Sequence, residues 1–198
     1  MLTQTIQLYE NRPHVTLTTY LWSDSPVLQN GRKRPAVLIC PGGAYLICSD
    51  REAEPVALRF AAMGYHAFVL RYSTYSEGAP FILPLSGEAQ NLPVNPQCVH
   101  PAPMRDLAKA FLVIREHAEK WLVDAEKIIL CGFSAGAHNC AMYAVYWHTP
   151  IIHEFFGKEP EAFKPAAAIL AYGLYDYHLM MRERADPLAR AISEAANS

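Results

Sequence analysis

The feature that most constrains this chain is the five-residue motif Gly-Phe-Ser-Ala-Gly at residues 132–136. It lies between residues 128–131, which predict a short buried strand, and residues 135–146, which predict an apolar helix. A serine between two glycines in this context matches a nucleophile elbow, a turn so sharp that a Cβ at either glycine would collide with neighbouring backbone. We therefore predict that Ser134 lies strained and exposed at the helix N-terminus and acts as a nucleophile.

The rest of the chain predicts strands that alternate with helices. Two polar-apolar alternating runs in residues 5–22, broken at residues 11–13, predict an antiparallel hairpin at a sheet edge. Further buried strands are expected at residues 36–40, 66–70 and 166–172, an amphipathic helix at residues 104–121, and a closing helix from Asp186 to about Ala196. This order predicts the α/β class, with a mostly parallel sheet and helices on both faces.

Two connecting segments leave alternatives open. The helix after the 36–40 strand begins either with a capping box formed by Ser49 and Glu52 or with Pro55 as its first residue, and Gly64 ends it. Residues 73–103 are rich in proline and predict a long irregular loop, which either borders a functional site or is mobile.

The composition predicts a globular chain and excludes several partners. The chain has 198 residues, of which 52% are hydrophobic and 18% charged, and this length suits a single domain. A net charge of -2 without a Lys- or Arg-rich stretch argues against nucleic acid. Neither a membrane-spanning run nor a signal-peptide pattern is found in the sequence. Five cysteines without a C-x-x-C pair predict free thiols and a reducing cytoplasm.

A second small-residue turn supplies what a serine nucleophile needs. Acyl transfer requires hydrogen-bond donors for the oxyanion, and residues 41–44, Pro-Gly-Gly-Ala, follow the 36–40 strand. Taken alone these residues are an ordinary turn. Their position two strand-helix units before the elbow favours an oxyanion hole, with the N–H group of Ala135 as its second arm.

Together these motifs resemble the α/β-hydrolases of the hormone-sensitive-lipase-like and acetyl-xylan-esterase-like group. Residues 41–45 are similar to the family's His-Gly-Gly-Gly-[Tyr/Trp] stretch. The other matching segments are residues 51–57 and 64–72, which resemble the bacterial acetylesterase branch, Asp106, residues 124–130 and the elbow itself. The likeness runs from about Pro35 to Tyr175.

The resemblance implies roles for named residues. It places the oxyanion donors at Gly43, Ala44 and Ala135. Pro41 and Ala44 replace the family's His and third Gly, but Gly43 and Ala44 both keep a backbone N–H. The implied activity is hydrolysis of short acyl esters, acetyl groups on sugars among them, without a metal or organic cofactor. The sequence also lacks H-E-x-x-H, which argues against a metal hydrolase.

The family's chain order Ser…Asp…His is not completed before residue 198. Only one helix follows the 166–172 strand, so roughly 70 residues of strand and helix are expected to be missing if a strand-helix unit takes about 30. We therefore expect residues 1–198 to be one domain that is incomplete at its C-terminus, with the acid and base beyond it. Asp176, just past a strand end, is a weaker candidate for the acid.

Several other side chains near the elbow have two interpretations. His138, one helical turn after the serine, is expected to be structural or solvent-facing rather than a base, whereas His100 could reach the site from its loop. Tyr45, Tyr72 and Tyr75 either line an acyl pocket or pack near strand ends.

Three functions remain open at this stage. The first is a serine esterase that acts on a small ester substrate. The second is a catalytically inactive, hydrolase-like fragment or scaffold without the triad Asp and His, whose open strand edge predicts a homo-oligomer or aggregation. A thioester or peptide hydrolase ranks last, because the sequence shows no basic pocket for coenzyme A.

Overall fold

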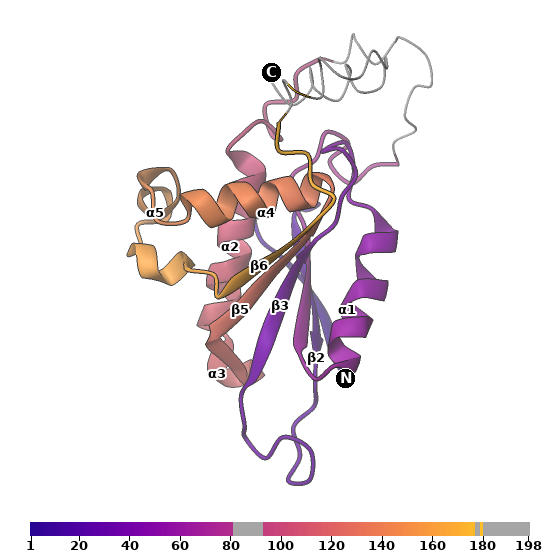
Figure 1. The fold of residues 1–198 in the computed structure, drawn as a ribbon, viewed down its shortest axis with the longest axis vertical. Coiled ribbons are helices and arrows are strands. Elements are labelled where there is room, and N and C mark those ends of the chain that lie inside the picture. The colour runs from indigo at the N-terminus through magenta and orange to yellow at the C-terminus, as the bar shows by residue number, and fades with distance from the viewer. Residues whose placement is uncertain (81–92, 177–178, 180–198) are drawn as a thin grey trace.

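The computed structural model describes residues 1–80, 93–176 and 179. In these residues one six-stranded sheet has the strand order β1-β2-β4-β3-β5-β6 (Figure 1). The strands are β1 (Leu2–Gln7), β2 (Thr16–Leu21), β3 (Arg34–Cys40), β4 (His66–Arg71), β5 (Val123–Phe133) and β6 (Ala167–Ala171). Strands β4, β3, β5 and β6 are parallel to one another, and β1 and β2 pair antiparallel, so the predicted mostly parallel α/β sheet is confirmed.

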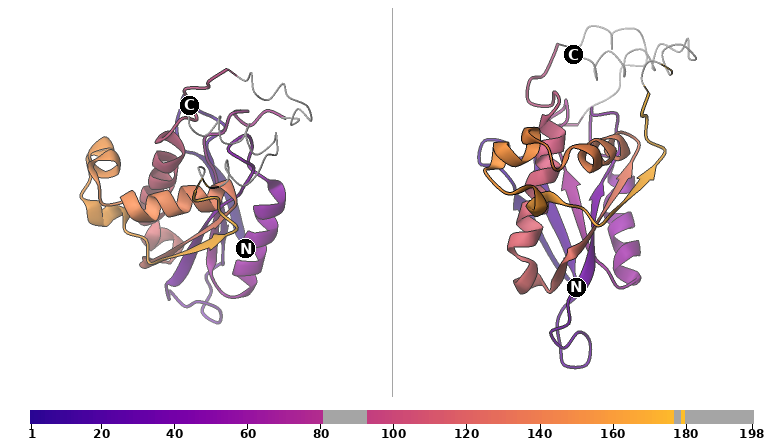
Figure 2. Two further views of the ribbon diagram at one scale, coloured as in Figure 1. Left: turned by 45° about the horizontal axis from the view of Figure 1, so that its top comes forward. Right: turned by 60° about the vertical axis from the view of Figure 1, so that its left-hand side comes forward.

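Helices cover both faces of this sheet (Figure 2). Helix α1 (Glu54–Ala62) lies on one face, and α2 (Ala102–Glu116) and α4 (Ala135–Tyr146) pack on the other. The shorter helices are α3 (Ala118–Trp121), α5 (Pro150–Phe156), η1 (Asp50–Glu52) and η3 (Pro160–Phe163). None of the helices in the described residues is both long and apolar enough to cross a membrane.

The central strands are buried because both faces are covered. Residues 36–40 of β3 have 0% exposed surface. Alternate side chains enter different cores: Leu38 belongs to the cluster under α2 and α4, whereas Val37 belongs to the cluster that contains Ala57 of α1. An unbroken apolar run is typical of a parallel strand between two helical layers.

The predicted edge hairpin is confirmed. Leu2 pairs with Leu21 and Gln7 with Thr16, so β1 and β2 form a regular antiparallel ladder. Strand β1 is exposed along most of its length, whereas β2 is largely buried beside β4. The hairpin therefore closes one edge of the sheet.

Strand β6 corrects the prediction of a buried strand at residues 166–172. It pairs with β5, but its residues 167–170 are exposed, with Ile169 at 45% and Leu170 at 40%. The apolar sequence suggested a central position, whereas β6 is the outermost strand of the described sheet. The predicted closing helix from Asp186 lies outside the described residues.

Two helix predictions are also refined. The amphipathic pattern from Met104 to Trp121 is split at His117 into α2 and α3, and the His117 ring stacks on Trp121 with centroids 4.5 Å apart. The capping box is wrong, because the Ser49 side chain makes no capping hydrogen bond and α1 begins at Glu54 with Pro55 in its first turn.

A buried histidine in β4 makes stability depend on pH. His66 has 0% exposed surface, and its Nδ1 accepts a hydrogen bond from the Trp22 N–H at 3.2 Å. Burial, reinforced by the positive charge of Arg34, lowers the pKa of His66 from 6.5 to about 4. Between these two values the unfolded chain binds a proton that the folded chain does not, so the free energy of unfolding falls as the pH falls.

We expect this histidine to remove about 3 kcal/mol of stability between pH 7 and pH 4. Urea denaturation at a series of pH values measures the effect, and His66→Asn gives the comparison because it removes the titrating group. The pH profile of the variant should be flatter over this window. Parallel profiles for the two proteins would contradict the prediction.

Candidate active site

The predicted elbow is present as a strand, a one-residue turn and a helix. Strand β5 ends at Phe133, α4 begins at Ala135, and Ser134 between them has φ 51° and ψ -118°. This backbone conformation is disfavoured for any residue with a Cβ, and it persists only where surrounding contacts impose it. The Ser134 N–H donates to the Ala171 carbonyl, and the Ser134 carbonyl accepts from the His138 N–H, both at 3.0 Å.

Glycine is required on both sides of the serine. A Cβ at Gly132 would collide with the backbone of Gly136, and a Cβ at Gly136 would collide with the carbonyl oxygens of Cys40 and Pro41. The start of α4 therefore packs directly against the end of β3, which is the close approach that the sequence pattern predicts.

The turn after β3 touches the serine. A Cβ at Gly42 would lie 2.9 Å from the Ser134 Cβ. Gly43 and Ala44 follow with φ of 130° and 57°, and the Gly43 carbonyl accepts from the Leu46 N–H at 2.9 Å. The structure thus brings residues 41–44 beside the elbow, and we call these four residues the oxyanion turn.

The backbone donors predicted for an oxyanion hole are Gly43, Ala44 and Ala135. Within residues 1–80, 93–176 and 179, no protein acceptor binds the N–H groups of Gly43, Ala44 or Ala135. Ala135 is the first residue of α4, where the helix dipole and the free N–H groups favour an anion.

The described residues do not complete a triad. None of them forms a hydrogen bond with the Ser134 hydroxyl. Asp176, the in-chain candidate for the acid, is exposed and accepts a hydrogen bond from the Leu179 N–H at 2.7 Å. No histidine in the described part of the chain forms a hydrogen bond or ion pair with Asp176.

His138 is held by a tyrosine of the neighbouring loop. Its Nδ1 lies 2.8 Å from the Tyr45 hydroxyl, and the two rings meet edge to face. Burial, with His100 adding to the effect, lowers the pKa of His138. The structural role expected for His138 stays a prediction.

Tyr72 forms a hydrogen bond with the oxyanion turn. It is 1% exposed, its ring packs edge to face on Tyr45, and its hydroxyl donates to the Pro41 carbonyl at 2.7 Å. Tyr72 therefore packs near a strand end, which is one of its two interpretations.

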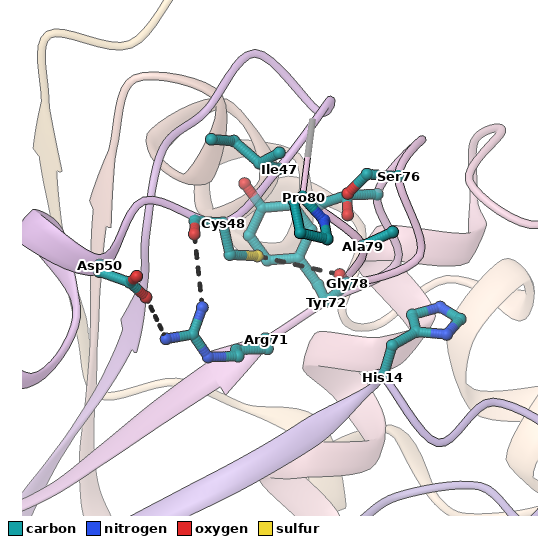
Figure 3. A pocket seen from close by; sticks show the side chains of 11 residues that line it. His14, Ile47, Cys48, Asp50, Arg71, Tyr72, Ser76, Gly78, Ala79 and Pro80 are labelled. Carbon is teal, nitrogen blue, oxygen red and sulfur yellow. Dashed lines mark hydrogen bonds and ion pairs between the residues drawn. The ribbon is translucent and has the colours of Figure 1, made fainter. Parts of the chain in front are cut away.

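A cavity of about 350 Å³ lies beside this support, at the carboxyl end of β4 (Figure 3). Arg71 donates to the Asp50 carboxylate at 2.5 Å and to the Cys48 carbonyl at 3.3 Å along one side. The remaining lining residues are His14, Ile47, Tyr72, Thr74, Ser76, Gly78, Ala79 and Pro80. Its volume suits a small ligand, and Tyr72 links its wall to the oxyanion turn.

No group of three His, Cys, Asp or Glu side chains in the described residues could hold a metal ion. All five cysteines are free thiols, as predicted, and Cys40, Cys131 and Cys140 are buried. Burial raises the pKa of the Cys131 thiol to about 12, so this group behaves as a small apolar side chain.

Glu52 makes two contacts near the serine that the sequence did not predict. Its Oε2 accepts the Gly42 N–H at 2.7 Å, and its Oε1 accepts the Tyr172 hydroxyl at 2.8 Å. The only local signal was an acidic residue close to a helix start, which we interpreted as part of a capping box.

The sheet order, the strained serine between a strand and a helix, and the backbone donors after the neighbouring strand define an α/β-hydrolase-type protein. The BD-FAE family matches residues 91–197, just over half of the chain, and the chain belongs to this family.

Individual relatives agree with this assignment. The chain is 35% identical to endo-1,4-beta-xylanase B of Butyrivibrio fibrisolvens over 115 residues, which are 58% of this chain and 15% of the relative. It is 29% identical to esterase LipQ of Mycobacterium tuberculosis over 152 residues, 76% of this chain and 31% of the relative. The carboxylesterase Cest-2923 of Lactobacillus plantarum superposes with a TM-score of 0.72 at 26% identity, covering 100% of this chain and 65% of that one. The chain thus spans less than a third of the curated relatives it matches.

Proposed function

We propose that this chain carries the nucleophile of a serine esterase. Ser134 attacks the ester carbonyl, and the N–H groups of Gly43, Ala44 and Ala135 bind the oxyanion. One observation supports this proposal above the others: the strained Ser134 touches a turn in which the N–H groups of Gly43 and Ala44 have no acceptor in the described part of the protein. Donors that are fixed before the charge develops stabilise the transition state most effectively.

The reaction runs through an acyl-enzyme. The Ser134 Oγ forms a bond to the carbonyl carbon and gives its proton to a general base, and the alcohol leaves with that proton. Water then attacks the acyl group and restores the free serine. We assign the base and its partner acid to residues outside those described, because no described histidine bonds the serine.

The names of the relatives and the chemistry of the site support a proposal for the substrate class. One relative is named an esterase and the other an endo-1,4-beta-xylanase. We propose a short acyl ester, with an acetylated sugar as the favoured substrate. Chemistry at backbone donors and a serine needs no cofactor.

The alternative is a catalytically inactive scaffold. The Ser134 hydroxyl has no partner in the described residues, and β6 exposes an edge strand with Ile169 and Leu170 at its surface. An open edge of this kind favours pairing with another chain, including a second copy of this one. This alternative predicts an oligomer in size-exclusion chromatography and a serine of ordinary reactivity.

Labelling with a fluorophosphonate tests the two functions against each other. The probe reacts only with a serine that a base has activated. In the protein that also carries the acid and base, we therefore expect rapid modification of the peptide that contains Ser134, read by mass spectrometry. The same protein unfolded in urea should not react. No labelling of a folded protein that also carries the acid and base would contradict the esterase and support the scaffold.

A further inference from the structure

We propose that Glu52 is the positioning residue of the oxyanion turn: its carboxylate clamps Gly42 to Tyr172, and this clamp sets the direction of the Gly43 and Ala44 N–H groups. The inference rests on the proposed function and adds a residue to it. Glu52 lies at the end of η1, between β3 and α1, and is half-buried.

The first part of the clamp acts on the oxyanion turn. The Gly42 N–H donates to Glu52 Oε2 at 2.7 Å, which is the length of a charge-assisted hydrogen bond. The Gly42 carbonyl accepts the Ser49 N–H at 2.8 Å. Both peptide groups of Gly42 are therefore fixed, and the orientation of the following N–H groups depends on them.

The clamp is in direct contact with the elbow. A Cβ at Gly42 would meet three groups at almost the same distance: Glu52 Oε2 at 2.8 Å, the Phe133 carbonyl at 2.8 Å and the Ser134 Cβ at 2.9 Å. The Glu52 carboxylate and the Ser134 side chain therefore both lie against Gly42 of the oxyanion turn. A small displacement of Glu52 must move the turn relative to the serine.

The second part of the clamp reaches across the sheet. Tyr172 follows β6 with φ 42°, packs on Phe133 with ring centroids 5.8 Å apart, and donates its hydroxyl to Glu52 Oε1 at 2.8 Å. Desolvation and the bond to Glu52 raise the pKa of Tyr172 to about 12, so the hydroxyl remains a donor at neutral pH. Because β5 lies between β3 and β6, Glu52 joins the loops on both sides of the elbow strand.

An ionised carboxylate cannot bind the oxyanion itself, because it only accepts hydrogen bonds and carries the same charge. Its effect must therefore pass through the Gly42 N–H. A loss of this bond should lower the rate of the chemical step and leave substrate binding nearly unchanged, since misplacement of donors by about 1 Å can cost roughly 100-fold in rate.

Three variants test the clamp. Glu52→Ala removes both hydrogen bonds. Glu52→Gln keeps an acceptor for Gly42 and a polar group for Tyr172. Glu54→Ala is the matched control, because it removes an exposed carboxylate two residues further along. In the protein that also carries the acid and base, we expect Glu52→Ala to lower kcat for p-nitrophenyl acetate by about 10- to 100-fold with KM changed less than about twofold. Glu52→Gln should restore most of kcat, and Glu54→Ala should match the wild type.

The hydrogen-exchange rate of the Gly42 amide, measured by NMR, reports on its bond to Glu52 and does not depend on catalytic activity. We expect at least about 10-fold faster exchange in Glu52→Ala and recovery in Glu52→Gln, since a lost hydrogen bond exposes this amide. Unchanged exchange at Gly42, or an unchanged kcat in Glu52→Ala while hydrolysis still depends on Ser134, would overturn the inference.

The proposed function fails separately, if the wild-type protein that also carries the acid and base shows no hydrolysis that depends on Ser134. The exchange rates then still decide whether Glu52 holds the turn. Thermal melting of the three variants excludes global unfolding as the cause, and Tyr172→Phe, which removes one exposed donor only, should give a smaller loss of kcat than Glu52→Ala.

Discussion

In the protein that also carries the acid and base, replacing Ser134 by alanine is expected to lower kcat for p-nitrophenyl acetate by more than about 1000-fold. The hydroxyl is the only group removed, and in the proposed mechanism it forms the bond to the acyl carbon. The oxyanion donors remain in Ser134→Ala because they are backbone N–H groups, so a small residual rate over water should persist. Initial-rate kinetics on the purified variant measure the loss.

Stability should not explain the loss. Alanine keeps the Cβ of Ser134, and therefore the backbone at φ 51° is strained to the same degree in both proteins. The Ser134 N–H and carbonyl bonds to Ala171 and His138 are main-chain bonds that the variant retains. Equal denaturation midpoints are expected.

Ser25→Ala provides the matched control. The loop between β2 and β3 lies at the opposite end of the sheet from the start of α4 (Figure 1). Ser25 belongs to this loop, and its carbonyl closes a turn there. This variant should hydrolyse the ester at the wild-type rate. Substantial esterase activity in Ser134→Ala would contradict the assignment of the nucleophile.

The parts of the fold that local sequence patterns encode were predictable. The apolar runs of β3 and β4 and the glycines around Ser134 each describe a short segment whose surroundings repeat in many proteins. The exposure of β6 could not be predicted this way, because an apolar strand has the same sequence whether it is covered by neighbours or is the outermost strand. Only the sheet order decides between these positions.

The clamp at Glu52 was unpredictable for a related reason. Its bond to Tyr172 joins residues that are 120 positions apart in the chain. The local sequence Ser49 to Glu52 matched a capping box, yet the carboxylate binds Gly42 because that N–H lies beside it in the folded protein. Long-range polar contacts of this kind leave no periodic signal.

A second long-range cluster surrounds Asp106, which the sequence marked only through a family resemblance. Asp106 is fully buried in α2, and Arg12 from the hairpin loop forms an ion pair with it at 3.0 Å. The Ser73 N–H donates to the same carboxylate at 2.8 Å, and the Arg12 guanidinium lies 3.7 Å above the Tyr9 ring. One carboxylate therefore joins the hairpin, the end of β4 and α2.

Burial raises the pKa of Asp106, and the donors from Ser73 and the charge of Arg12 oppose this shift. Removing the carboxylate leaves a largely buried guanidinium and a buried N–H without their acceptor. We expect Asp106→Ala to lower the free energy of unfolding by about 3–5 kcal/mol, as in other buried ion pairs that lose one partner. Urea denaturation at pH 7 measures this loss.

Two further variants identify the source of this loss. Glu161→Ala breaks an exposed ion pair with Lys164 at 3.8 Å and should cost less than about 0.5 kcal/mol. The double variant Arg12→Met with Asp106→Leu should be more stable than Asp106→Ala, because it removes the unpaired charge and fills the space with apolar atoms. A cost below about 1 kcal/mol for Asp106→Ala would show that water or another donor replaces the pair. Ser73 is the first residue of the loop that lines the cavity beside Tyr72, and its N–H donates to Asp106. A loss of about 3–5 kcal/mol in the free energy of unfolding would therefore agree with a carboxylate that fixes this loop against the sheet.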